Sequence, residues 1–476
     1  MQKLNEICFC ESKANSETEF VGIRCEKSKE DGAQETSIIF PLGYFKDDST
    51  LRELPEEELR ECVVNLFTVL SDPSLQEQIH QDSSISTFAE EHGESEFPMV
   101  SYLNVIRNFL DFGYLDEKEI LYKKGANGKI NWGRTIKAVQ PVITEDAQNL
   151  VYLDFIARKV SYNEDTLITQ VHKFCVHDAL VKLGFLFGVD PSEEPLLDFD
   201  YDLFCNAIHS KLAKTFNDRD LRLLADLARI VEYLAGHKTE DGKTADDFYF
   251  GVNKFAPVWE AMVDKIFGKL PLGVAKDKFN PHCEWDLSSR KPGYENPNYA
   301  MRPDTIMWDE EGNRLYVLDA KYYKFGVTGS ASDLPSSGSI CKQIAYAEYV
   351  ETHWKKILGV DSIATPSASL QNDTQPKPIY NAFLLPYCFD ADNSQLPPDD
   401  GFETRPCKMR FIGYCHGNWK NLDARPGEGD YRPYHRIAGI LLDVRSVMEN
   451  YAASNNYTVI HSFGTLLQSQ TLSFPI

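Results

Sequence analysis

The sequence has no long hydrophobic run and no apolar segment at its start. No stretch approaches the roughly 20 apolar residues that a helix needs to cross a bilayer. The opening residues, Met1–Glu6, do not supply the apolar core that a signal peptide requires. We therefore predict a cytoplasmic protein with no membrane partner.

Cysteines at metal-binding spacing are also missing. The eleven cysteines are an odd number and are scattered along the chain, which is typical of a protein in a reducing compartment. The tightest pair, Cys8 and Cys10, has no companion pair of cysteines or histidines at the spacing of a structural zinc site. Reduced thiols without a metal are the expectation.

Basic residues are few relative to acidic ones. The chain has 49 Lys and Arg against 72 Asp and Glu, a formal net charge of −23. Affinity for duplex DNA rests largely on cations that neutralise phosphates. A DNA-cleaving protein of this composition therefore needs a partner that provides most of the DNA-binding affinity. Two local basic clusters, residues 405–410 and 432–436, are either strand contacts or solvated loops.

A nucleotide-binding P-loop is absent as well. The run G-x-x-x-x-G-K-S/T occurs nowhere in the chain, so any nucleotide-driven motor must be another polypeptide. A length of 476 residues predicts about two to four domains and is ample for a sizeable core.

What the sequence does contain is a hairpin that presents carboxylates, residues 301–325. Asp304 follows a proline at the head of one predicted strand, and the turn 309–313 returns the chain to a strand that leads to Asp319 and Lys321. These last two residues are two apart and share one face of a strand. The hairpin lays Asp304 beside Asp319, which predicts a site with two carboxylates and one ammonium.

Such a trio suits metal-assisted hydrolysis of a phosphodiester. Carboxylate oxygens bind Mg²⁺ or Mn²⁺, the ion polarises the phosphate and lowers the pKa of a bound water, and the lysine orients that water or offsets charge. Mg²⁺ is the expected cofactor, with Mn²⁺ as the alternative. The arrangement resembles the PD-(D/E)xK nuclease signature, here Pro303-Asp304 followed by Asp319-Ala320-Lys321. For the hairpin alone, solvated surface charges explain the pattern equally well.

A predicted helix precedes the hairpin, over residues 257–267, with a proline in its first turn and a glycine after its end. Glu260 borders the apolar stripe of this helix and is a third predicted metal ligand, alongside Asp304 and Asp319. The alternative is a solvated glutamate that the helix dipole favours.

A second predicted helix, residues 340–350, follows the hairpin and carries Gln343 and Tyr346 three apart on one face. The pair resembles the Q-x-x-x-Y element of RecB-like nucleases but has one residue fewer between its members, so Tyr349 stays open as the second member. This resemblance implies that Gln343 belongs to the catalytic set and that Gln343 and Tyr346 hold the DNA strand. Lys324 is a further predicted DNA contact.

Pattern and composition divide the chain into three regions. Residues 1–95 form an α+β N-terminal docking or scaffold region, and residues 96–245 combine a winged-helix-like hairpin with a helical connector. Residues 246–476 form the predicted PD-(D/E)xK nuclease domain, an α/β fold with a central mixed sheet flanked by helices. The expected elements are helices at 56–70, 102–110, 165–183, 220–235 and 443–451, and strands at 120–124, 129–137, 380–387, 409–414 and 437–442.

Beyond the hairpin, the chain resembles the LlaJI-type restriction endonuclease family from about Phe40 onward. The segments 128–136, 302–304 and 318–323 and the two connecting helices carry the resemblance. That family is similar to the McrC nuclease subunit of modification-dependent restriction systems. The resemblance implies a bacterial defence protein whose nuclease subunit works with a separate McrB-like AAA+ GTPase that also recognises DNA.

Together these observations predict a Mg²⁺-dependent endodeoxyribonuclease subunit that cleaves double-stranded DNA. Its predicted catalytic residues are Glu260, Asp304, Asp319, Lys321 and Gln343. Two other functions fit the sequence: a non-catalytic interaction protein whose acidic surface binds a basic partner, and a RecB-like exonuclease that degrades linear DNA from its ends.

Overall fold

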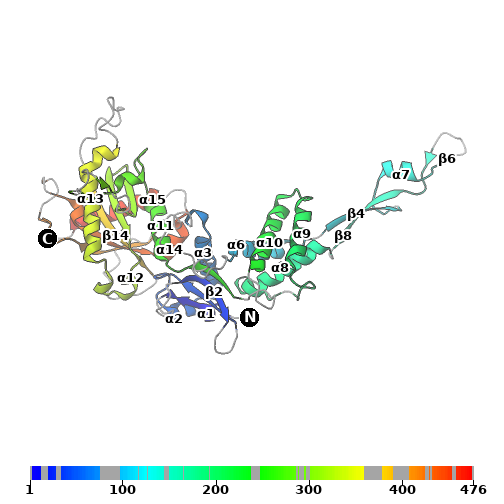
Figure 1. Cartoon of the computed structure of the whole chain (residues 1–476), viewed down its shortest axis with the longest axis horizontal. Helices are drawn as coiled ribbons and strands as arrows, with labels where there is room; N and C mark the ends of the chain where they lie inside the picture. The colour runs from blue at the N-terminus through cyan, green and yellow to red at the C-terminus, as the bar shows by residue number, and fades with distance from the viewer. Residues whose placement is uncertain are drawn as a thin grey trace, which may run out of the picture. The chain divides into compact units, whose positions relative to one another are not determined.

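The protein is described here by a computed structural model. The described residues are 3–11, 20–27, 34–75, 97–115, 117–125, 127–143, 150–163, 166–191, 193–236, 247–285, 288, 294–295, 301–358, 378–389, 407–423, 428, 431–452 and 457–473. Two compact units emerge (Figure 1). The helical unit is Glu94–Asp246 with Met1–Lys3, and the two-sheet unit is Leu4–Gly93 with Asp247–Ile476. No helix among these residues is long and apolar enough to cross a membrane.

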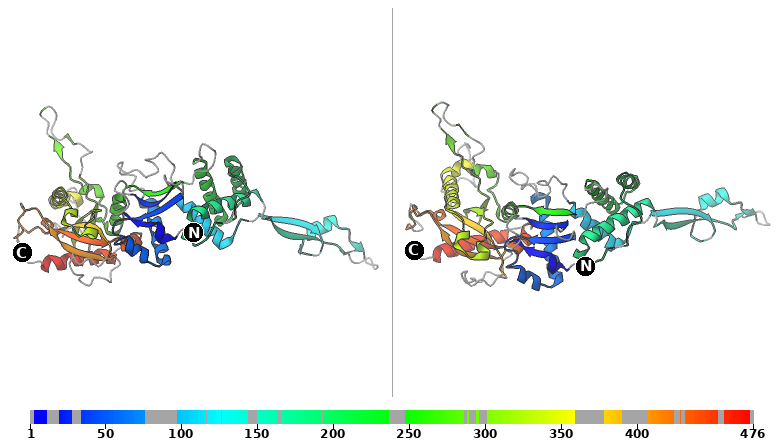
Figure 2. Two further views of the ribbon diagram at one scale, coloured as in Figure 1. Left: turned by 90° about the horizontal axis from the view of Figure 1, so that it is seen from below. Right: turned by 60° about the horizontal axis from the view of Figure 1, so that its bottom comes forward.

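The two-sheet unit is built from two separate stretches of chain, because strands from both form its first sheet. The strand order is β1-β3-β2-β9, with β1 Cys8–Cys10, β2 Val21–Lys27, β3 Gln34–Phe40 and β9 Phe248–Val252. Strand β9 pairs antiparallel with β2, as Figure 2 shows for the green strand beside the blue ones. The described residues between Leu4 and Leu75, which belong to the region predicted at 1–95, therefore form one unit with those that follow Asp247.

The second sheet is mixed, as the sequence predicted. Its order is β12-β13-β14-β16-β15, with β12 Thr305–Asp309, β13 Arg314–Ala320, β14 Ile379–Tyr387, β15 Met409–Cys415 and β16 Ile437–Asp443. Strands β13, β14 and β16 run parallel to one another, while β12 and β15 are antiparallel edge strands. Nearly every residue of β13 and β14 is buried, as expected for parallel strands covered on both faces.

Helices cover both faces of this sheet. On one face, Val317 of β13 packs in a core cluster with Val350 and Trp354 of α13 (Ser337–Leu358). On the other face, Tyr316 packs edge-to-face with Phe463 of α15 (Tyr457–Ser473), which also contacts α11 (Ala256–Phe267). Side chains alternate along a strand, so Asp319 belongs to the α13 face.

This unit contains further helices and strands. They are α1 Leu4–Ile7, α2 Asp48–Glu53, α3 Glu56–Leu70, α12 Phe325–Thr328, α14 Val444–Asn450, and the pair β10 Glu284–Trp285 and β11 Tyr294–Glu295. The 3₁₀ turns are η3 Lys276–Phe279, η5 Ala331–Asp333 and η7 Pro433–His435. The predicted helix 56–70 is confirmed as α3, and the three strands predicted after residue 379 are confirmed as β14, β15 and β16.

The helical unit packs four helices around an apolar core. They are α6 Met99–Phe112, α8 Leu167–Leu183, α9 Tyr201–Leu212 and α10 Asp218–Gly236, with the short turn η2 Gly184–Leu186. The predicted helices 102–110, 165–183 and 220–235 are confirmed, with each end within three residues of its predicted position. Asp226 of α10 accepts hydrogen bonds from Ser101 and Asn104 of α6, which fixes the contact between these helices.

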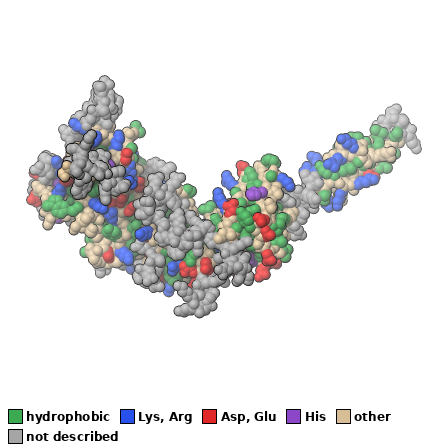
Figure 3. Space-filling view, in the orientation of Figure 1, with side chains coloured by type: hydrophobic (Ala, Val, Ile, Leu, Met, Phe, Trp, Pro, Cys, Tyr) green, Lys and Arg blue, Asp and Glu red, His purple; other side chains and the backbone are tan. Residues whose placement is uncertain are grey.

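The predicted hairpin at 120–137 lies in an arm of the helical unit, and its strands are paired differently from the prediction. The arm consists of β4 Glu117–Lys124, β5 Lys129–Ile130, α7 Trp132–Ala138, β6 Val142–Ile143, β7 Leu150–Val151 and β8 Ile156–Asn163. The strand order is β4-β8-β5, so β4 pairs with a strand more than thirty residues away along the chain and not with its neighbour. Lys and Arg side chains lie along this arm in Figure 3.

The strand predicted over 129–137 is confirmed only at its first two residues, which form β5, because the helix α7 begins at Trp132. The side chain of Asn131 accepts a hydrogen bond from the backbone N–H of Arg134 at 3.0 Å, which caps the first turn of α7. Gly128 lies so close to β8 that a Cβ atom on it would be 2.5 Å from the carbonyl oxygen of Arg158. The Asn-Gly signal thus marks a tight contact with β8.

Candidate active site

Asp304 and Asp319 come together through the register of the β12–β13 hairpin. Thr305 pairs with Leu318, so Asp304, one residue before β12, reaches the end of β13. The backbone N–H of Ala320 donates to Oδ2 of Asp304 at 3.0 Å. The turn that closes the hairpin holds Asn313 at a φ of 52°, a backbone angle that asparagine tolerates better than most residues.

Lys321 completes the site. Its Nζ lies 2.9 Å from Oδ1 and 2.8 Å from Oδ2 of Asp319. The backbone N–H of Lys321 donates to the carbonyl of Leu384 in β14 at 2.9 Å, so the sheet fixes the residue that carries the ammonium. The two carboxylates and the ammonium expected from the sequence are therefore adjacent in the structure.

Asp304 and Asp319 are two carboxylates that lie close together where little water reaches them, which makes their charged forms less favourable. Burial raises the pKa of Asp304 well above its usual range, and the charge of Asp319 and a hydrogen bond with it raise that pKa further. Burial by itself lowers the pKa of Lys321, but Asp319 and Asp304 outweigh this effect, so the pKa of the lysine is raised. A shared proton or a bound cation offsets the repulsion between the two carboxylates.

Glu260 lies on α11, which covers the opposite face of the sheet from α13. Its charge raises the pKa of both Asp304 and Lys321, so it acts on the site electrostatically. Among the described residues, however, no three His, Cys, Asp or Glu side chains are grouped closely enough to hold one ion. The three ligands predicted from the sequence are thus a close pair with a third acid near them.

The pair opens into a cavity of about 380 Å³. The hairpin and the first turns of α13 line it, through Met301, Arg302, Asp304, Asp319, Lys321, Ser339, Lys342 and Tyr346. Arg302 and Lys342 are exposed side chains at this cavity, and the sequence analysis did not select either as a site residue. The available signals were their positions, directly before Pro303 and directly before Gln343.

Tyr346 and Gln343 have different roles in the structure. The Tyr346 hydroxyl donates to the carbonyl of Arg302 at 3.0 Å and its ring lines the cavity. Burial, followed by the charges of the two aspartates, raises the pKa of Tyr346 to about 12. Gln343 is fully buried, and its Nε2 donates to the carbonyl of Val317 at 2.6 Å.

Gln343 therefore fastens α13 to β13 and does not line the cavity. Of the two tyrosines left open by the sequence, Tyr346 lines the cavity, whereas the ring of Tyr349 stacks on His353 at 4.4 Å. Lys324 is exposed beside the start of α12 and is not among the cavity-lining residues.

The donor set fits Mg²⁺ or Mn²⁺. Mg²⁺ sites in phosphoryl-transfer proteins use one or two carboxylates and complete six-fold coordination with waters and substrate phosphates. Asp304 and Asp319 supply that number of carboxylates. Burial and the neighbouring acids raise the pKa of Asp304, and a bound cation would act in the opposite direction.

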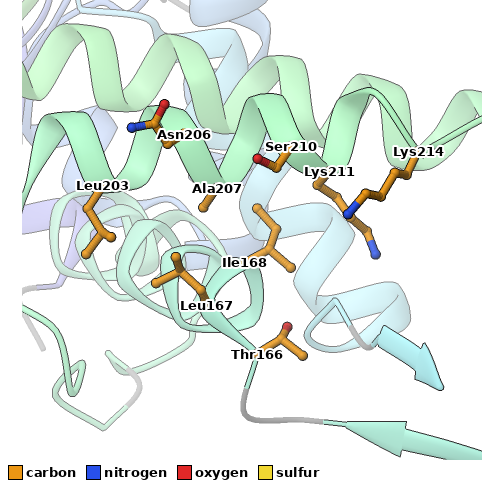
Figure 4. Close-up of a pocket in the computed structure, with 9 residues that line it drawn as sticks. All are labelled: Thr166, Leu167, Ile168, Leu203, Asn206, Ala207, Ser210, Lys211 and Lys214. Atoms are coloured by element: carbon orange, nitrogen blue, oxygen red, sulfur yellow. The ribbon is translucent and has the colours of Figure 1, made fainter.

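A second groove, in the helical unit, offers no such chemistry. It has a volume of about 290 Å³ and lies between the start of α8 and one face of α9 (Figure 4). Its lining residues are Thr166, Leu167, Ile168, Leu203, Asn206, Ala207, Ser210, Lys211 and Lys214. None of these residues is acidic, so the groove cannot supply the carboxylates that a hard divalent cation needs.

Comparison with known proteins places the chain among restriction endonucleases. A family model described as LlaJI restriction endonuclease matches residues 39–395. This match covers most of the sequence, and the chain belongs to that family. The resemblance drawn from the sequence is confirmed.

Two individual proteins add to this comparison. The Type II restriction enzyme BsuMI component YdjA of Bacillus subtilis (strain 168) is 25% identical over 249 residues, which are 50% of this chain and 51% of that protein. The chain thus spans about half the length of this curated relative. A chain in the refined half-complex of Thermococcus gammatolerans McrB AAA+ hexamers with bound McrC is 12% identical, with a TM-score of 0.30, over 94% of this chain and 82% of that one.

Proposed function

We propose that this chain is the Mg²⁺-dependent endodeoxyribonuclease subunit of a restriction system, with a nuclease fold of the PD-(D/E)xK type. The observation that carries the proposal is the contact of Asp304, Asp319 and Lys321 in one cavity that also has exposed cations. Membership of a restriction endonuclease family supports the same activity.

Each side chain has a role that its surroundings suggest. Asp304 and Asp319 hold the cation, which when bound polarises the scissile phosphate and acidifies a water. Lys321, kept charged by Asp319, orients the attacking water and offsets charge that develops on the phosphate. Glu260 assists through water, since its charge raises the pKa of both Asp304 and Lys321.

DNA contacts follow from the cavity lining. Arg302 and Lys342 line the cavity, and we expect them to neutralise phosphates of the bound strand. Tyr346 is a neutral hydroxyl over a wide pH range, because its pKa is raised to about 12, and it contacts the strand from the cavity wall. Lys324 is a more distant phosphate contact. Gln343 is a positioning residue in this proposal, because it is buried beneath α13.

The partner in this proposal is an AAA+ GTPase of the McrB kind. Two observations on the chain support it: the sequence has no P-loop, and its net charge of −23 disfavours DNA binding without help. The arm of the helical unit also exposes large apolar side chains, namely Trp132, Ile136, Val142, Ile143, Leu150, Val151 and Leu153. Exposed apolar clusters of this kind mark protein–protein contact sites.

Cleavage of covalently closed plasmid tests the function. The purified chain, with the AAA+ protein and GTP, should nick or linearise the closed circle in Mg²⁺ and not in EDTA. A preparation that degrades linear DNA and spares the closed circle would establish the exonuclease instead. Absence of cleavage with either DNA, under conditions where both proteins bind it, would establish the non-catalytic interaction protein.

A further inference from the structure

We infer that Glu11 and Tyr322 form a positioning pair that holds the catalytic lysine of the nuclease site from the N-terminal sheet, an inference that rests on the proposed function. Tyr322 directly follows Lys321 in the chain, whereas Glu11 lies 311 residues earlier. Glu11 also lies outside the part of the sequence that the family model matches.

The contact is a cluster of three hydrogen bonds. The hydroxyl of Tyr322 donates to Oε2 of Glu11. The backbone N–H of Leu42, just after β3, is shared between Oε2 of Glu11 at 2.9 Å and the Tyr322 oxygen at 2.6 Å. A carboxylate that accepts two such bonds makes stronger contacts than a neutral acceptor. The first sheet and the segment after β13 are therefore joined directly at this point.

The same tyrosine reaches the helix that carries the third acid. Its ring packs against Phe255 with a centroid distance of 5.5 Å, and Phe255 is the residue before the first turn of α11. Glu260 stands on that helix. Tyr322 thus contacts the N-terminal sheet and the start of α11 while its neighbour Lys321 contacts Asp319.

The segment after β13 is held by β14 on its other side, where Phe325 packs on the core cluster of Phe383 and Leu385. The strand ends at Ala320, and beyond it the backbone N–H of Lys321 donates to Leu384. Four methylenes separate that backbone from the ammonium, so the position of Nζ depends on how the segment is held. Loss of the Tyr322 contact frees the segment on one side. A displacement of about 1 Å in a catalytic group is enough for a rate loss near 100-fold.

Tyr322→Phe and Glu11→Ala test the inference in the full chain with its AAA+ partner. We expect kcat for plasmid cleavage to fall about 10- to 100-fold, with KM for DNA unchanged. The unfolding midpoint falls as well, because the backbone N–H of Leu42 loses an acceptor, so rates are compared at a temperature where every variant is folded. Glu11→Gln keeps an acceptor and should retain most of the wild-type rate. The double variant should be no slower than either single variant, because both single variants break the same hydrogen-bond cluster. Tyr323→Phe changes the next, exposed tyrosine and is the matched control.

A second measurement separates this inference from the proposed function. Hydrogen–deuterium exchange of residues 320–325 should become faster in Glu11→Ala and Tyr322→Phe and stay unchanged in Tyr323→Phe, whether or not the wild-type chain cleaves DNA. If the wild type cleaves, full kcat in Tyr322→Phe overturns the inference. If the wild type does not cleave, unchanged exchange in that segment overturns it, and the proposed function fails separately.

Discussion

Residues of one chemical type behave differently at different places in this protein. Asp304 has a strongly raised pKa because burial and Asp319 act together on it. Asp309, on the same hairpin and also buried, accepts a hydrogen bond from the backbone N–H of Gly312 at 3.0 Å and lies outside the cavity. Function at this scale therefore follows from the neighbours of a carboxylate, and Asp309 is a natural control for Asp319.

Local spacing was sufficient to predict part of the site. A hairpin with Asp304 at its head and Asp319 and Lys321 at its end has few ways to fold, so sequence alone placed these three together. Arg302 and Lys342 were not selected, because exposed cations of this kind carry no periodic signal that separates them from solvated ones. Their role depends on where α13 begins relative to the hairpin, which is a tertiary fact.

A buried histidine in the helical unit gives a prediction on pH dependence. Burial lowers the pKa of His172 to about 4, and its Nδ1 accepts the backbone N–H of Leu115 at 3.0 Å. The unfolded chain has a histidine pKa near 6.5 and binds one more proton between these two values. Stability is therefore complete above about pH 6.5 and falls as the pH is lowered toward about 4.

Between pH 7 and pH 5 the wild-type chain should lose about 2 kcal/mol of unfolding free energy from this group. Denaturant unfolding at both pH values, compared with His172→Asn, measures the loss. Asparagine offers an oxygen near the position of Nδ1 but does not titrate, so the variant should show a smaller loss by that amount. Equal losses in the two proteins would contradict the assignment.

At the scale of elements, a helix or strand could be predicted from the sequence when the pattern that indicates it lies within the element itself. Helix α3 and strands β14 and β16 were predicted because an apolar periodicity or a continuous apolar run lies within each. The pairing of β4 with β8 was missed, since an Asn-Gly turn between 124 and 129 favours a local hairpin while the true partner lies beyond α7. Strand partners at long separation leave little local trace in one sequence.

Two neighbouring residues of α13 give an element-scale prediction. Gln343→Leu removes the donor to Val317 and should lower the unfolding free energy by about 1–3 kcal/mol, with little change in DNA affinity per folded molecule. Lys342→Ala should leave stability unchanged, weaken DNA binding and reduce the salt slope of log Kd by about one. Thermal unfolding and binding titrations at several salt concentrations measure both effects. If Gln343→Leu weakened DNA binding without lowering stability, Gln343 would be a direct DNA contact, contrary to this prediction.

At the scale of the whole molecule, the chain order does not match the structural units. The two-sheet unit takes strands β1–β3 from one end of the chain and β9 onward from the other, and Lys265 of α11 pairs with Asp72 at 3.2 Å. The sequence predicted residues 1–95 and 246–476 as separate regions. Composition and linkers indicate where a region ends, but they do not indicate which regions pack against each other. The acidic balance of −23 also belongs to this scale, where it favours a DNA-binding partner.

A split chain tests this organisation. Residues 247–476 produced alone should be insoluble or unfolded, because β9 loses its partner strand β2 and leaves an open sheet edge. Co-production with residues 1–93 should give a soluble complex that purifies as one species and shows a cooperative unfolding transition. An isolated 247–476 fragment that unfolds at the same midpoint as the pair would contradict a discontinuous unit.

The most direct measurement of the central claim is single-turnover cleavage of closed plasmid in Mg²⁺ by three full-length proteins with the AAA+ partner: wild type, Asp319→Asn and Asp309→Asn. Asp319→Asn should cleave more than about 100-fold more slowly, because the cation loses a ligand and Lys321 its counter-charge, while Asp309→Asn cleaves at a rate close to wild type. Wild-type rates in Asp319→Asn, or equal losses in both variants, would contradict a nuclease site at Asp304, Asp319 and Lys321.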